Sequence, residues 1–236
     1  AISDNISGSS VDGSLGYNLN EDISFMGKIS ISSHQPNYNF TLFKSKYISC
    51  NWENDFKNIE NRQFNLEFKS KKYFDLRVDY IDVKNLAYFT KDEFDAIKPF
   101  QFSDNINVIK LRVSREFSVN KFFFDNEIQY QKASNANGIL NVPELITRNS
   151  IYFGSHLLDK ALFLQTGFSI SYFSKYHMNS YDPLLSEFYV QNSKKIGGFP
   201  LMDFFVNAKI QQTRLYFKLE HFNSSFTGYN FYSAPN

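Results

Sequence analysis

The chain has little cysteine, little glycine and no long apolar run. Its 236 residues contain a single cysteine, Cys50, so the sequence excludes an internal disulfide framework. No stretch approaches the ~18 consecutive apolar residues that a transmembrane helix needs. The 25 Lys and Arg residues nearly balance the 24 Asp and Glu residues, which argues against a basic nucleic-acid-binding protein. These three classes of protein are therefore excluded.

The apolar content of the chain is instead concentrated in aromatic rings. The sequence holds 27 Phe and 15 Tyr residues, and aromatic residues make up 18% of it, although the mean hydropathy is only −0.39. An intrinsically disordered chain would be poor in aromatic residues. Many rings combined with low mean hydropathy are typical of β-strands that are apolar on one face only. A water-exposed sheet and a membrane barrel both fit this composition.

Alternation of apolar and polar residues recurs from end to end of the chain. In 62–70, for example, Phe64, Leu66 and Phe68 alternate with polar residues. An α-helix would need a period of 3.6, so this period of two predicts strands, about eleven in all. Cys50 is then expected to be a half-buried strand residue. The expected strands are 13–19, 22–33, 38–51, 62–70, 73–89, 105–118, 121–132, 149–158, 161–175, 201–210 and 214–223.

The connections between these segments alternate in length over most of the chain. The short ones are 70–72, 119–121, 158–160 and 211–213, and the long ones are 52–61, 90–104, 133–148 and 176–200. A short pairing element is expected at 186–191, inside the last long connection. Short turns at one end and long loops at the other are typical of an antiparallel up-and-down transmembrane β-barrel. Near the N-terminus the rule fails, because the connections 20–22 and 34–37 are both short.

The polar face of the predicted strands carries charges of both signs, whereas the other face is almost free of them. In a barrel surrounded by lipid, such a face would line a water-filled lumen. In a soluble β-protein it would simply meet water, and this alternative stays open. The residues predicted to line a pore are Glu67, Lys69, Asp75, Arg77, Asp79, Lys110, Arg112, Glu116, Asp125, Glu127, Asp203, Lys209, Arg214, Lys218 and Glu220.

Tyrosine and tryptophan gather near the ends of the predicted strands, as Trp52, Tyr130, Tyr152 and Tyr172 illustrate, whereas phenylalanine dominates strand middles. Rings with a polar tip favour the membrane–water interface. Two aromatic girdles around an apolar band would give this distribution. A packed soluble core would also bury Phe, so the pattern favours a membrane barrel without deciding the question.

The expected number of strands bears on how much of a barrel the chain forms. Bacterial single-chain barrels close with an even number of strands, and an unpaired edge would leave backbone groups unsatisfied in lipid. With about eleven strands by this reading, residues 1–236 are expected to form a single β-barrel domain that is a fragment of a larger barrel. We expect at least one strand after residue 236, and the chain to be a processed protein or a fragment.

Several segments of the C-terminal third carry a family resemblance. They are 140–145 (LNVPEL), 161–167 (ALFLQTG), 187–191 (EFYVQ), 203–210 (DFFVNAKI) and 220–229 (EHFNSSFTGY). Over residues 100–236 the chain resembles the "putative porin" family of Bacteroidetes outer membranes. The resemblance implies an outer-membrane β-barrel, further barrel before residue 1 and a final aromatic-rich strand. It implies no catalytic residue, since the family pattern defines none.

The residue types that carry metal or catalytic chemistry are scattered. The four histidines, His34, His156, His177 and His221, show no metal-ligand spacing. Ser155 and His156 would suggest a hydrolase, but neighbouring strand residues point to opposite faces. A calcium site formed by loop acids is a weaker hypothesis, because their spacing fits no EF-hand. Those acids are Asp92, Glu93, Asp95, Asp182 and Glu187.

Two functions from different classes follow from this reading, neither of them enzymatic. The first is a bacterial outer-membrane channel for passive diffusion of small polar solutes, narrowed by inward-folded loops. The second is a structural or docking barrel with a plugged lumen inside a larger secretion or assembly complex. A soluble β-sandwich adhesin is a third hypothesis. The expected partners are outer-membrane lipid, small polar solutes and other outer-membrane subunits, with no cofactor, no metal and no nucleic acid.

Overall fold

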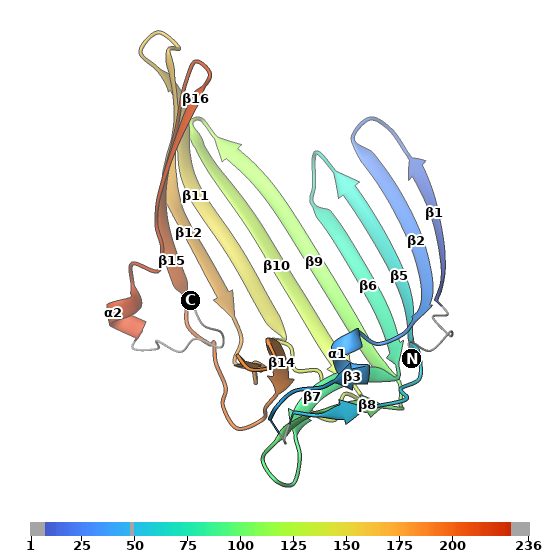
Figure 1. The fold of residues 1–236 in the computed structure, drawn as a ribbon. Helices are drawn as coiled ribbons and strands as arrows, with labels where there is room; N and C mark the ends of the chain where they lie inside the picture. Colours follow the sequence, from blue (N-terminus) through green and yellow to red (C-terminus); the bar gives the residue numbers. More distant parts are fainter. Residues whose placement is uncertain (1–7, 48–49, 228–236) are drawn as a thin grey trace.

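A computed structural model describes residues 8–47 and 50–227, and its main element is one curved antiparallel sheet (Figure 1). Ten strands follow one another in this sheet in chain order, so all of their connections are of the up-and-down type. The all-β antiparallel prediction is confirmed. The strands are β1 (Ser9–Asn18), β2 (Ile23–His34), β5 (Ile59–Ser70), β6 (Asp75–Lys84), β9 (Ile106–Val119), β10 (Phe122–Ser134), β11 (Leu145–Leu157), β12 (Leu162–Phe173), β15 (Leu201–Ile210) and β16 (Thr213–Leu219).

The strand predicted at 38–51 is wrong. This segment instead forms helix α1 (Tyr38–Thr41) and strand β3 (Leu42–Phe43), which pairs with β4 (Trp52–Glu53) outside the main sheet. Removing this strand leaves ten instead of about eleven. The connection from β2 to β5 therefore becomes a long one, 35–58, and the alternation of short and long connections extends to the N-terminal strands.

The predicted strand 73–89 is also too long, because the chain bends at Asn85. Asn85 has a φ of 57°, a left-handed conformation that asparagine tolerates better than most residues. Its amide donates to the carbonyl oxygen of Asn58 at 3.0 Å. Strand β6 ends just before this bend, and β7 (Leu86–Lys91) leaves the main sheet to pair with β8 (Ile97–Phe102).

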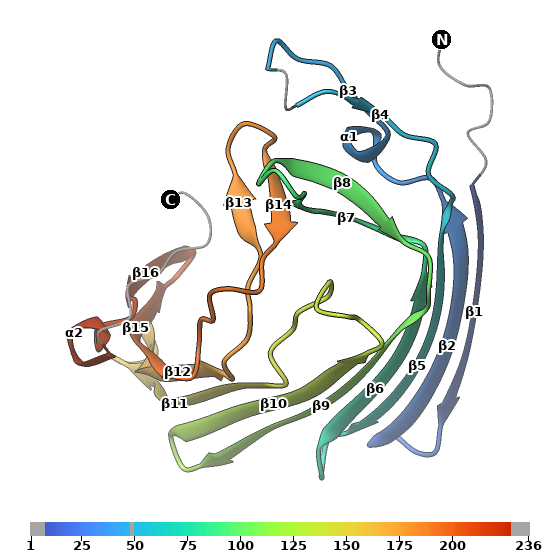
Figure 2. The ribbon, with the colours of Figure 1, turned by 90° about the horizontal axis from the view of Figure 1, so that it is seen from below.

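The long connections fold together at one end of the sheet. The element expected at 186–191 is confirmed as β14 (Glu187–Val190), which pairs with β13 (Ser180–Asp182) and, in parallel, with β7. Figure 2 shows β7, β8, β13 and β14 reaching across the concave side of the curved sheet. We call the folded parts of connections 35–58, 85–105 and 174–200 the loop cap. The short helix α2 (Ser224–Thr227) follows β16, and neither four-residue helix could cross a membrane.

The most tightly packed side chains lie in the loop cap and where it meets the sheet. One cluster joins Cys50, Trp52, Phe89 and Leu185, which come from all three connections. Cys50 is therefore a buried residue of the loop cap and not a half-buried residue of a barrel strand. Phe40 and Phe43 stack on this cluster, with ring centroids 4.5 Å from Phe89 and 5.0 Å from Trp52 respectively.

Within residues 8–47 and 50–227, no second sheet packs on the face of the main sheet that carries Leu66 and Ile109, and large apolar side chains there stay exposed. Leu66 is 47% exposed and Ile109 is 49% exposed, and both lie on the face opposite the charged residues. The Phe-rich sides of the strands therefore do not meet in a dry interior, as they would in a soluble sandwich. Strands β1 and β16 are the two edges of the sheet, and within residues 8–47 and 50–227 they do not pair with each other.

Candidate functional site: the concave wall

The register of the sheet brings the predicted pore-lining residues onto one face. Directly paired residues in neighbouring strands share a face, so the row Glu67, Arg77, Arg112 and Gln129 fixes the parity across four strands. The strand pairings place the other predicted pore-lining residues of these strands, and those of β15 and β16, on the same face. Glu220 follows β16, where the ammonium of Lys218 contacts its carboxylate at 2.7 Å. We call this face the concave wall.

Packing shows that the charged face is the concave one. Ile81 and Val108 lie on it, each two residues from a charged side chain in its strand. Together with Ile106 they form a cluster with Leu86 and Phe102 of the long connection 85–105. The concave wall is therefore apolar beneath the loop cap, and polar farther along the strands.

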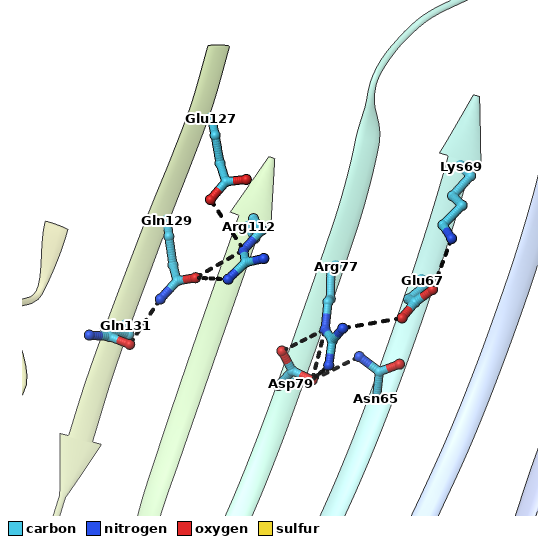
Figure 3. A network of polar contacts seen from close by, with 9 residues as sticks. All are labelled: Asn65, Glu67, Lys69, Arg77, Asp79, Arg112, Glu127, Gln129 and Gln131. Atoms are coloured by element: carbon cyan, nitrogen blue, oxygen red, sulfur yellow. Dashed lines mark hydrogen bonds and ion pairs between the residues drawn. The ribbon is translucent and has the colours of Figure 1, made fainter. Parts of the chain in front are cut away.

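The best-connected part of the wall centres on Asp79 (Figure 3). Arg77 Nε donates to the Asp79 carboxylate at 3.1 Å, and the Asn65 amide donates to it at 2.8 Å. The other side of the Arg77 guanidinium reaches Glu67 at 3.4 Å, and Glu67 also pairs with Lys69 at 3.5 Å. The charges of this group are therefore mutually neutralised and held along two adjacent strands.

A second group lies beside it on β9 and β10 (Figure 3). Arg112 donates from Nη2 and Nε to the Gln129 side-chain oxygen at 2.8 and 3.0 Å, and its Nε lies 3.7 Å from Glu127. Gln129 donates in turn to Gln131 at 3.0 Å, and Gln131 donates to the carbonyl oxygen of Pro143. The side-chain amides of Gln129 and Gln131 thus extend this network toward the long connection between β10 and β11.

The acids of the wall also form a row that runs across the strands from the short-turn end of β9 to the loop-cap end of β15. Glu116, Asp125 and Asp203 lie in one row across the sheet, with Ser150 and Ser169 bridging it through a 3.0 Å hydrogen bond. Toward the short turns, the basic residues are Lys209, Arg214 and Lys218. Lys218 links the two groups, because it lies 3.0 Å from Asp203.

An aromatic patch on the concave wall corrects one part of the girdle hypothesis. Tyr152 does not face outward, because its ring stacks on Phe123 with centroids 5.0 Å apart and lies 6.1 Å from Phe205. Its hydroxyl donates to Glu116 at 2.9 Å. Trp52 likewise belongs to the loop cap, whereas Tyr130 is exposed on the outer face.

Sequence reasoning missed several polar residues of the wall. Lys28 has the right parity in a correctly predicted strand, so alternation alone would have found it. Arg148, the partner position of Glu127, lies before the predicted start of its strand at 149, whereas β11 begins at Leu145. Residues 145–150 alternate poorly between apolar and polar types, so the alternation predicts a start of this strand that is too late.

Hydrogen bonds tie the three connections of the loop cap to one another. The Asn39 amide of connection 35–58 donates to Glu187 of connection 174–200 at 2.8 Å, and the Thr90 hydroxyl of connection 85–105 donates to the Val190 carbonyl oxygen at 3.3 Å. Burial raises the pKa of the Tyr88 and Tyr176 phenols above their ordinary value, so both rings stay neutral. The loop cap is thus a bonded layer and not a set of independent loops.

The structure does not assemble a metal or hydrolase site from the residues considered above. Asp92 accepts backbone N–H groups of its own turn at 2.9 Å, and Asp182 does the same in another turn. No group of three or more His, Cys, Asp or Glu side chains lies together in the part of the chain that the structure describes. Ser155 and His156 pair with successive residues of β12 and so point to opposite faces.

The chain matches one protein family over its whole length. A family model described as "Putative porin" matches residues 1–236, which extends the resemblance upstream of residue 100. The chain belongs to this family. Porins are a non-enzymatic kind of protein, and no curated protein matches the chain.

Solved structures show the same fold at low sequence identity. The chain is similar to the ferric enterobactin receptor of Pseudomonas aeruginosa, with a TM-score of 0.59 and 14% identity over 90% of this chain and 35% of that chain. It is also similar to a siderophore receptor of Acinetobacter baumannii, with a TM-score of 0.56 and 10% identity over 91% and 37% of the two chains. The chain spans about a third of the length of these structures. With its family and its fold, this putative porin is an outer-membrane β-barrel protein of bacteria.

Proposed function

We propose that the concave wall lines a water-filled channel through which small polar solutes diffuse passively. In this proposal residues 1–236 form a single β-barrel domain, a piece of a larger barrel. The observation that carries it is the contrast between the two faces of the sheet. One face holds ion pairs and amides, such as Arg77 with Asp79, and the other exposes Leu66 and its neighbours.

Charge pairing along the wall supports weak ion selectivity. Most of the acids predicted to line the wall have a base within 4 Å, as Arg112 and Glu127 or Lys218 and Asp203 do, so most of the charge of the wall is paired. A passing ion meets potentials of both signs, whereas a neutral polar solute finds hydrogen-bonding groups along the polar part of the wall. The loop cap would set the upper size of solute, because its strands reach across the concave side (Figure 2).

Charge reversal in the full-length protein tests the lining role. The variant Arg112→Glu, Arg214→Glu and Lys218→Glu removes three positive charges from the wall and adds three negative ones. In planar bilayers under a salt gradient, we expect the cation-to-anion permeability ratio to rise severalfold, because fixed charge concentrates counter-ions in a narrow passage. Unchanged selectivity would refute the assignment of these residues to the lumen.

A matched control keeps the same charge change but moves it to the outer face. Arg62, Lys84 and Lys132 lie there, near the loop-cap end of their strands. Their replacement by Glu should leave the permeability ratio close to that of the unmodified protein. An equal shift in both variants would show that the effect comes from net charge and not from lining the lumen.

The packing of the loop cap favours a second candidate function, a plugged barrel that serves as a subunit of a larger outer-membrane complex. The cap has its own buried cluster, and β14 and β7 join two connections directly. Full-length protein that folds in vesicles but gives no steady conductance, and that co-purifies with partner subunits, would support this function over diffusion.

A further inference from the structure

A hollow in the concave wall lies between β1, β2, β5 and β6. It has a volume of about 310 Å³ and is lined by Asp12, Gly13, Ser14, Lys28, Ile29, Ser30, Gln63, Asn65 and Arg77. The row Ser14, Lys28 and Asn65 and the row Asp12, Ser30 and Gln63 both lie on the concave face. This volume is at the lower end of the range typical of small-ligand pockets, roughly 300–1,000 Å³. The hollow is therefore large enough for one small solute.

Asn65 is the unusual member of this lining. Its side chain is 3% exposed, and its amide nitrogen donates to Asp79 at 2.8 Å, but its Oδ1 has no hydrogen-bond partner among the described residues. The orientation follows from chemistry, since an ionised carboxylate only accepts and the NH₂ group must face Asp79. Figure 3 shows the amide oxygen on the side away from Asp79. A buried acceptor without a donor is rare in native proteins and points to a missing donor.

The nearby donors of the protein do not fill this role. The guanidinium of Arg77 is committed to Asp79 and Glu67. Lys28 makes no hydrogen bond or ion pair within residues 8–47 and 50–227, and its side chain is exposed on the same wall. Asp12 accepts from the Ser10 hydroxyl at 3.1 Å and also hydrogen-bonds to the Ser30 hydroxyl, and its carboxylate keeps further acceptor capacity. The hollow thus offers acceptors, the ammonium of Lys28 and the hydroxyl of Ser14.

We infer that this hollow is a weak binding subsite for an uncharged polyhydroxylated solute of the size of one sugar unit. Each sugar hydroxyl can donate, here to Asn65 Oδ1 or Asp12, and can accept, here from Lys28. The uncommitted charges of Asp12 and Lys28 balance, so the lining favours neither an anion nor a cation. This inference deepens the proposed channel function and rests on it, because it places the subsite on the diffusion path.

Equilibrium binding tests the subsite without reference to conductance. Glucose is titrated into the full-length protein in detergent by calorimetry, with glycine as a zwitterionic probe and a polyethylene glycol of matched size as a probe that is poor in donors. We expect saturable binding of glucose only. Binding should weaken roughly fivefold in Asn65→Leu and in Lys28→Met, the loss that one hydrogen bond typically causes.

The matched control is Asn207→Leu, which replaces an asparagine of the same wall whose amide bonds to Gln165 and which does not line the hollow. Lys28→Met is a second test variant that should fold normally, because the Lys28 side chain is exposed and has no partner among the described residues. Absence of saturable glucose binding, preferential binding of glycine, or unchanged affinity in both hollow variants would overturn the subsite. Conductance measured on the same preparations separates the two proposals: current without glucose binding overturns the subsite alone, and binding without current overturns the channel.

Discussion

The ten-stranded sheet and the loop cap differ in how they keep apolar side chains from water. In the loop cap, Phe89 is 2% exposed and packs with Trp52 and Leu185 as in a small soluble protein. In the sheet, apolar residues such as Ile109 remain exposed on the outer face, and the strands are joined by backbone pairing. The difference shows that apolar side chains of the loop cap pack against one another, as they must in water. The apolar side chains on the outer face of the sheet are left to contact lipid.

Truncating the centre of the loop cap should have the largest effect. Replacing Phe89 with Ala removes a buried ring from the cluster with Trp52 and Leu185, a change that typically costs about 3–5 kcal/mol. We expect connections 35–58 and 174–200 to become sensitive to protease while the β-signal in far-ultraviolet circular dichroism persists. Loss of the whole β-signal would show that the cap and the sheet form one cooperative unit and would break the comparison.

A charge placed on the outer face of the sheet should have the next largest effect. Leu111→Arg puts a guanidinium where lipid is expected, which costs about 2–4 kcal/mol near the bilayer midplane. Urea unfolding from vesicles measures the loss. Ser114→Arg, on the same strand but on the concave wall, where it pairs with Asp75 and Glu127, is the control and should cost much less. Equal losses in the two variants would contradict the assignment of faces.

The smallest expected effect concerns close packing within the sheet. A Cβ on Gly167 would collide with the Ile151 carbonyl oxygen and with Tyr152, whereas a Cβ on Gly13 would meet nothing within 4 Å. Gly167→Ala should therefore destabilise the protein by about 1–3 kcal/mol, the usual cost of overpacking. Gly13→Ala should be near neutral in the same urea titration. A neutral Gly167→Ala would show that β11 and β12 can shift apart.

Much of the sheet could be predicted because the period of a strand is local. Alternation in segments such as 62–70 and 201–210 fixes both the strand and the face of each side chain. The segment 38–51 misleads for the same reason. Its apolar residues Phe40 and Phe43 are partly buried within the loop cap, and local spacing does not reveal which surface an apolar side chain will meet.

The residues of the candidate site could be predicted from the sequence, but the contacts between their side chains could not. Parity assigns Arg77 and Asp79 to one face, yet it does not show that Asn65 from the neighbouring strand turns its amide to the same carboxylate. That contact depends on register, which the turns between strands set. The hollow at Asn65 is therefore visible only once the strands are placed side by side.

The parallel contact between β7 and β14 has a kinetic consequence. Thr90 donates to the carbonyl oxygen of Val190 at 3.3 Å, so two segments a hundred positions apart close the loop cap. Contacts between such distant segments form slowly, because the loop entropy of everything between them opposes their meeting. Four strands of the sheet, β9 to β12, lie in that interval, so they can pair hairpin by hairpin before the loop cap closes. Folding of this molecule would then end with the closure of the loop cap.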